Sequence, residues 1–245
     1  MSFEGRGLSE VVDEDLGVGK LFLMVYEQGT GGEFFLKQFF SEKEESSNNI
    51  LITTNEDPVD IKRILSKNGM ADDGEIFDLS SMMEDEMDRV CRKDKFVEDG
   101  ILVTDLLDIS TKEEVGYDEI PLDIRIMAKI STTAIKQVTP YRFVIDDFGD
   151  IISICPVTEL KKRLLILRKS LRQNRGVGVL GILGKNSDLK DLMNVFDGIL
   201  KMEVRKGEGS LDRYLVIKHL KNDLSVPKSL KVDENGNIPK ALSIG

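Results

Sequence analysis

Short apolar runs alternate along this chain with longer segments of mixed polarity. Several runs are almost wholly apolar, as strands covered on both faces should be. The gap between the first two holds a helix and a loop, which fits a right-handed crossover between parallel strands. We therefore predict an α/β fold, a mainly parallel twisted sheet with helices on both faces. The predicted strands are Leu21–Tyr26, Ile50–Thr54, Ile101–Val103, Phe143–Ile145, Val177–Leu183, Gly198–Val204 and Arg213–Leu220.

The clearest predicted helix spans Val157 to Asn174, where leucines recur at helical spacing and form one apolar stripe. The other face is basic, and we expect it to be solvated or to form a rim facing an acidic partner; nucleic-acid contact is the alternative. The stripe consists of Leu160, Leu164, Leu167 and Leu171, and the cations are Lys161, Lys162, Arg163, Arg168, Lys169 and Arg172.

Polar segments separate these elements. Ser41–Asn49 is predicted to be a surface loop, and the charge-dense stretch Met70–Lys95 to be a solvated, partly helical excursion. Turn residues at Lys206–Ser210 predict an antiparallel β-hairpin at the sheet edge. Without an internal repeat or a strong linker, residues 1–245 are predicted to form a single domain.

Net charge, cysteine content and hydrophobicity indicate which partners and which cellular compartment to expect. The formal net charge of −10 argues against a chain that wraps nucleic acid or anionic lipid as a whole, although a local basic face leaves nucleic-acid contact open. Cys91 and Cys155 lack metal-ligand spacing and are expected to be free thiols in a reducing compartment. With no apolar run near the roughly 20 residues that span a bilayer, and a polar, acidic N-terminus, we expect a cytoplasmic protein without a membrane partner.

A glycine-rich turn follows the first strand directly. Glu27-Gln28-Gly29-Thr30-Gly31-Gly32-Glu33 stands between Leu21–Tyr26 and an apolar helical pattern, the context that a phosphate-binding loop requires. This segment resembles the P-loop of KaiC-like and RecA-superfamily ATPases, G-E-P-G-T-G-K-[ST]. The resemblance implies that Gly29, Thr30, Gly31, Gly32 and Glu33 would contact nucleotide.

Three positions depart from that pattern. Tyr26 stands at the first Gly, Gly32 at the phosphate-binding Lys and Glu33 at the magnesium-binding Ser or Thr. Losing the lysine removes a charge-assisted contact worth about 1.5–3 kcal/mol, and hydrolysis should suffer more than binding. The loop is thus a turn without ligand, a weak or altered nucleotide site, or an ATPase site in which Lys37, Lys185 or Lys218 replaces the missing charge. Lys37 is expected to pair with Glu33 at i,i+4 instead.

Acidic residues after two other strands extend the resemblance. Glu56 and Asp57 follow the second strand and match paired acids of the family, with Glu56 as candidate general base; alternatively they cap the next helix. Asp146 ends a hydrophobic run that resembles a Walker B strand, which implies magnesium binding. Otherwise Asp146 is a relic or a hydrogen-bond acceptor within the loop.

The resemblance spans roughly residues 15 to 235. Phe196–Leu200 resembles an A-D-G-V-I strand, and Lys218 matches the lysine of a K-M-R-G strand end whose arginine is Leu220 here. Lys218 would reach a nucleotide of the next subunit, or is a plain surface lysine. His219, the only histidine, has no partner in sequence for a metal site or a triad.

Family members with disabled loops act as regulatory or scaffold subunits, many of them archaeal. The resemblance therefore implies a non-catalytic RecA-like protein that works through protein partners, either itself or other RecA-like subunits. The alternative is a nucleotide-binding sensor or weak ATPase that uses ATP or ADP with magnesium. No cofactor is firmly expected.

Overall fold

An eight-stranded sheet forms the centre of the molecule. The computed structural model describes residues 5–6, 18–42, 49–91, 97–98, 101–102, 141–184, 187–206, 211–220, 228–232 and 238–239. The strand order is β11-β10-β9-β2-β8-β7-β3-β4. From β9 to β4 the strands run parallel, whereas β10 is antiparallel to both β9 and β11. The strands are β2 (Lys20–Tyr26), β3 (Ile50–Thr53), β4 (Glu75–Asp78), β7 (Arg142–Ile145), β8 (Val177–Leu183), β9 (Gly198–Lys206), β10 (Leu211–Leu220) and β11 (Lys228–Val232).

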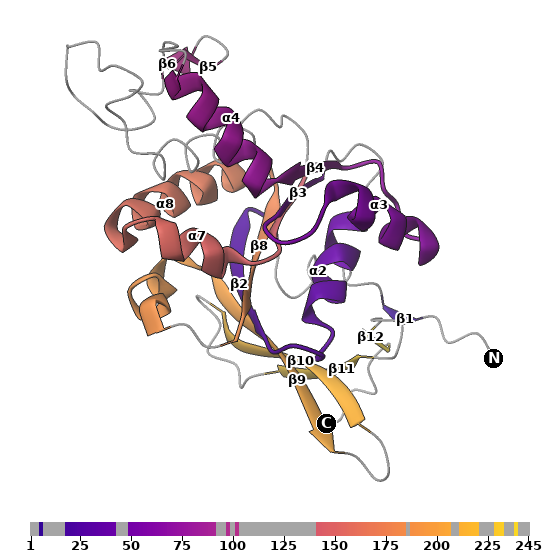
Figure 1. Ribbon diagram of the computed structural model, residues 1–245. Coiled ribbons are helices and arrows are strands. Elements are labelled where there is room, and N and C mark those ends of the chain that lie inside the picture. The colour runs from indigo at the N-terminus through magenta and orange to yellow at the C-terminus, as the bar shows by residue number, and fades with distance from the viewer. Residues whose placement is uncertain are drawn as a thin grey trace.

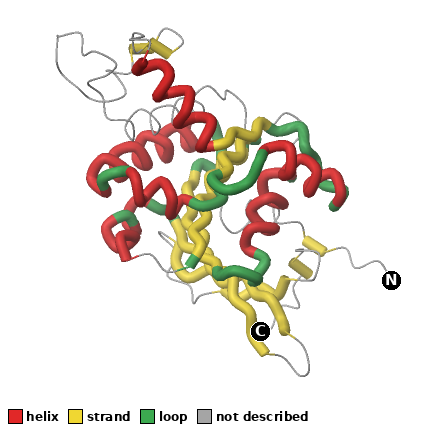
Figure 2. Tube along the Cα trace, in the orientation of Figure 1, coloured by secondary structure: helices red, strands yellow, loops and turns green. Residues whose placement is uncertain are grey.

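Helices cover both faces of this sheet, as the sequence predicts (Figure 1). On one face lie α2 (Gly32–Ser41) and α3 (Pro58–Lys67), and on the other α7 (Phe148–Ile154) and α8 (Val157–Gln173). Figure 2 shows the two helical layers with the strands between them. The remaining elements are α4 (Leu79–Cys91), the 3-10 helices η3 (Ser187–Asp191) and η4 (Met193–Val195), and the short strands β1 (Gly5–Arg6), β5 (Val97–Glu98), β6 (Ile101–Leu102) and β12 (Ile238–Pro239).

Alternation along β2 builds two cores from one strand. Leu21 and Leu23 face α7 and α8, while Phe22 and Met24 face α2, and all four are fully buried. Successive side chains of a strand point to opposite faces, so a strand with helices on both sides must be apolar throughout. The wholly apolar run in the sequence follows from this position in the middle of the sheet.

Helix α8 confirms its predicted stripe and corrects part of its predicted basic face. The four leucines of the stripe are buried against the sheet. Arg163, however, is 2% exposed and pairs with Glu159, and Arg168 donates from Nε to Asp197 at 2.8 Å. Arg172 also contacts Asp197. The solvated face therefore excludes Arg163, and much of its remaining charge is neutralised within the chain.

Other segments differ from their predictions. Met70–Lys95 is not only a solvated excursion, because Glu75–Asp78 forms β4 and pairs with β3 at the sheet edge. Ile101–Leu102 pairs with β5 in a separate two-stranded ladder, so the expected strand there does not join the main sheet. The antiparallel β9–β10 pair is present, but β11 forms the edge beyond it. The loop residues 43–48 and the turn residues 207–210 lie outside the described residues.

Two chemical expectations can be compared with the described residues. The Cys155 side chain is buried and forms no disulfide, and the side chain of Cys91 lies outside the described part of the structure. None of the helices in the described ranges is both long enough and apolar enough to cross a membrane.

One buried asparagine joins the end of α2 to the start of β3 and β7. The Asn49 side chain donates to the carbonyl oxygens of Phe40 at 2.6 Å and Glu42 at 2.8 Å, and it accepts from the Arg142 backbone N–H at 3.1 Å. The orphan carbonyls at a helix C-terminus need such partners when they are buried. Asn49 therefore sets the direction in which the chain leaves α2, the helix that begins at the glycine-rich loop.

Replacing Asn49 with alanine should lower the free energy of unfolding by about 3 kcal/mol, because it leaves several buried backbone groups without partners. Urea unfolding of the variant measures this. Asn68→Ala is the matched control, since exposed Asn68 makes a single side-chain bond to the Ile64 carbonyl; its cost should stay below about 1 kcal/mol. Equal losses in the two variants would contradict the bridging role of Asn49.

Candidate functional site

The carboxyl ends of β2, β3 and β7 meet at one edge of the sheet. The glycine-rich loop follows β2, Glu56 follows β3 and Asp146 follows β7. Open α/β sheets bind ligands at this edge. The structure thus brings together the loop, Glu56 and Asp146, three features that the sequence places far apart.

Two glycines shape the loop. The Thr30 N–H and hydroxyl both donate to the Glu27 carbonyl, at 3.1 and 2.6 Å, which closes a turn. Gly29 occupies the turn position with φ +78°, and Gly31, at φ +88°, is the N-cap of α2. Both conformations are left-handed and favour glycine. The glycine-rich pattern is therefore accounted for locally, by a turn that leads directly into a helix.

Tyr26 fills the space above Gly32. A Cβ atom placed on Gly32 would lie 2.3 Å from Cγ of Tyr26, which is closer than real side chains approach. The ring is 3% exposed, also lies near Gly181, and donates its hydroxyl to the Asp146 carbonyl at 2.9 Å. No side chain fits at position 32 while the tyrosine ring stays there. The two departures from the P-loop pattern, at 26 and 32, are thus parts of one packing arrangement.

The electrostatic surroundings of Tyr26 are acidic. Burial raises the pKa of Tyr26 far above its ordinary value of 10.0, and the carboxylates of Asp147, Glu33, Asp146 and Glu56 raise it further. These four charges lie close enough to disfavour another negative charge at the hydroxyl. A phosphate placed beside the ring would meet the same repulsion.

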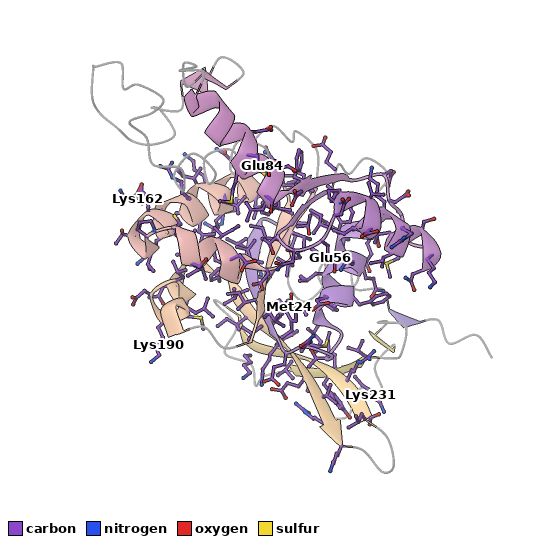
Figure 3. The ribbon with its side chains drawn as sticks, in the orientation of Figure 1. Met24, Glu56, Glu84, Lys162, Lys190 and Lys231 are labelled. Atoms are coloured by element: carbon purple, nitrogen blue, oxygen red, sulfur yellow. The ribbon has the colours of Figure 1, made fainter. Side chains whose placement is uncertain are left out.

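Glu56 is held by a buried lysine. Lys37 of α2 donates to Glu56 Oε1 at 2.8 Å, with the lysine side chain 7% exposed, and Figure 3 labels Glu56 at this end of the sheet. The expected Lys37–Glu33 pair is therefore wrong; Lys37 turns inward and Glu33 is exposed. Because Glu56 Oε1 already accepts from Lys37, that oxygen is not free to accept a proton from a water molecule.

Both remaining acids accept hydrogen bonds from other residues of the chain. Asp57 accepts from the Val59 N–H at 2.7 Å and caps α3. Asp146 Oδ1 accepts from the Thr54 N–H, the Thr54 hydroxyl and the Asp147 N–H. Burial raises the pKa of Asp146, while hydrogen bonds from Thr53, Thr54 and Asp147 oppose the rise. Asp146 therefore joins the end of β7 to the end of β3 by hydrogen bonds. The sequence analysis gave a role as hydrogen-bond acceptor as one alternative to magnesium binding.

Arg213, not Lys218, is the β10 cation beside the loop. Lys218 is exposed and lies in a bulge of β10, between the residues that pair with Leu200 and Ile199 of β9. Those two residues pair in turn with the middle of β2, so Lys218 is level with the middle of that strand and not with the loop at its end. The Arg213 side chain lies 3.5 Å from the Cβ position of Gly31. Sequence reasoning missed Arg213, although the register of an antiparallel hairpin already places the start of β10 at the carboxyl edge.

Packing between Tyr26 and position 32 can be measured by a double-mutant cycle. Gly32→Ala should destabilise the protein by about 1–3 kcal/mol, because the new methyl group overlaps the tyrosine ring. In a Tyr26→Ala background the same change should be neutral or stabilising, since alanine favours helix by up to about 1 kcal/mol over glycine. Urea unfolding of the four proteins gives the coupling energy. A Gly32→Ala effect that is the same in both backgrounds would contradict the proposed overlap.

Tyrosinate absorbance reports the raised pKa of Tyr26. The tyrosinate absorbance that the native protein gains with rising pH and Tyr26→Phe does not should appear well above pH 10, the ordinary pKa of tyrosine. Because the folded-state pKa is raised, the stabilisation linked to this proton is complete below about pH 10 and is lost as pH rises further. Tyr26→Phe should show less alkaline destabilisation in urea unfolding. A difference titration centred near pH 10 would mean that the phenol is solvated.

Among the described residues, no group of three or more His, Cys, Asp or Glu side chains could hold a metal ion. Searches with the whole sequence find no matching protein-family model and no matching curated protein.

Proposed function

We propose that this chain is a non-catalytic α/β domain of the RecA-like and KaiC-like type that acts by binding protein partners rather than by turning over nucleotide. The observation that carries the proposal is the packing of Tyr26 against Gly32, since the ring takes the room of the side chain that would bind phosphate. The carboxyl edge of the sheet is well packed, but the Tyr26 ring fills the space of a phosphate-binding side chain. We therefore infer a regulatory or scaffold role. The partners would be other copies or related subunits.

The charges at this edge support the same proposal. Hydrolysis of ATP depends on cations aimed at the transferred phosphoryl group and on a free base or water-positioning residue. Here Lys37 is paired with Glu56, and Asp146 is occupied by three donors from the chain itself. The groups that resemble catalytic residues are thus used for structure.

A second candidate, a nucleotide sensor, is favoured by one contact. Arg213 lies beside Gly31 at the start of α2, where a helix N-terminus attracts anions. A guanidinium could bind a phosphate in place of the lost lysine. Such a sensor would bind ATP or ADP without hydrolysing it, and its affinity would depend on Arg213.

Thermal-shift titration with ATP and magnesium separates these candidates. We expect no shift for the native chain, whereas binding at a hundredfold excess over Kd would stabilise the folded state by about 2.7 kcal/mol. The triple variant Tyr26→Gly, Gly32→Lys, Glu33→Thr should acquire a magnesium-dependent shift, because it removes the ring and restores the lysine and hydroxyl.

The double variant Gly32→Lys, Glu33→Thr is the matched control. It restores the same two residues but leaves Tyr26, so it should unfold more easily and gain no nucleotide binding. A magnesium-dependent shift of the native chain that is lost in Arg213→Gln would support the sensor instead. Steady release of phosphate by the native chain would contradict both non-catalytic readings.

A further inference from the structure

Strands β9 and β10 extend beyond the rest of the sheet (Figure 1). Pairing of β9 with β2 ends at Lys201 opposite Val25, while β9 and β10 stay paired as far as Lys206 and Leu211. We call residues 203–206 and 211–214 the hairpin tip. Beyond Lys201, the edge of β9 that faces away from β10 has no strand partner within the described part of the chain. Such an edge offers unpaired backbone donors and acceptors.

The two faces of the hairpin tip differ in chemistry. On one face Arg205 pairs with Glu203 at 3.2 Å and lies 4.6 Å above the Tyr214 ring, while Lys231 pairs with Asp212 at 2.9 Å. Figure 3 shows Lys231 on the neighbouring strand. The charges of this face are therefore satisfied within the chain.

The opposite face combines exposed aliphatic residues with cations that lack an ion pair. Val204 stands opposite Arg213, and Lys206 stands opposite Leu211. Val204 is 38% exposed and Leu211 is 70% exposed. Across the described residues, no carboxylate forms an ion pair with Lys206 or Arg213. This face is basic in a chain whose net charge is −10.

We propose that the hairpin tip binds an extended segment of a partner protein that carries acidic and aliphatic side chains, by strand addition to the free edge of β9. Main-chain hydrogen bonds would give affinity, and the alternate side chains would meet the cations and aliphatic groups. The inference rests on the proposed partner-binding function and names the chemistry of the partner. Nucleic acid fits less well, because its phosphates would use the two cations but leave Val204 and Leu211 uncovered.

A labelled, N-acetylated peptide of alternating Glu and Val is a direct probe. Its binding to the full chain, followed by fluorescence anisotropy at low salt, should weaken at least tenfold in Lys206→Glu, Arg213→Glu. The matched control is Lys162→Glu, Lys169→Glu, which makes the same change in net charge at exposed positions of α8 and should bind within twofold of the native chain. Leu211→Asp, at a 70% exposed residue, should also weaken binding while leaving the thermal unfolding midpoint unchanged.

Four results would overturn the proposal. Three are no binding of the Glu–Val peptide, equal binding of a Lys–Val peptide, or tighter binding of an oligothymidine that is lost in Lys206→Glu, Arg213→Glu. The fourth is peptide binding that survives N-methylation of every residue, which removes the backbone donors on both edges of the peptide and would exclude strand addition. The peptide experiment and the nucleotide titrations test different proposals. If the chain binds neither peptide nor ATP, the proposal for the hairpin tip fails, but the proposal that the chain does not use nucleotide is unaffected.

Discussion

The contact between the Tyr26 ring and Gly32 is the constraint on which the carboxyl edge of the sheet depends. Because the ring lies where a Cβ of residue 32 would be, the two positions cannot change independently. The tyrosine hydroxyl also bonds to the Asp146 carbonyl, so the same side chain links the glycine-rich loop to the end of β7. A change at position 32 therefore acts on the packing of the whole edge, and a lysine introduced there would meet the tyrosine ring.

The charged groups at this edge also contact one another within the chain. A phosphate site concentrates positive charge that has no partner until the ligand arrives, and such charge costs stability. Here Lys37 has Glu56, and Asp146 has donors from Thr54 and Asp147. These groups therefore have partners within the chain, whereas the second oxygen of Glu56, Oε2, is buried without a hydrogen-bond partner among the described residues. Residues that resemble catalytic groups are used to join three strand ends and the first helix.

The fold could be predicted from the sequence further than the site could. Apolar runs such as Val177–Leu183 report burial on two faces, and the helical leucine stripe of α8 reports packing, so both were predicted within a residue. Strand β4 was missed because Glu75–Asp78 is short and half-exposed at an edge, where sequence carries little apolar signal. The Lys37–Glu56 pair was missed because it joins elements 19 residues apart, whereas local spacing suggested Glu33.

The hairpin tip differs from the carboxyl edge in how its charged groups are paired. At the carboxyl edge the Tyr26 hydroxyl, Lys37 and Asp146 have partners within the chain. The hairpin tip, by contrast, extends past its neighbours, and among the described residues it has an open strand edge and two cations without ion pairs. Natural sheets usually protect such an edge, and charged residues such as Lys206 discourage indiscriminate pairing. A cation on a free edge repels basic strands and admits acidic ones. The feature that limits aggregation can therefore also select a partner, which makes the tip a more promising binding surface than the loop.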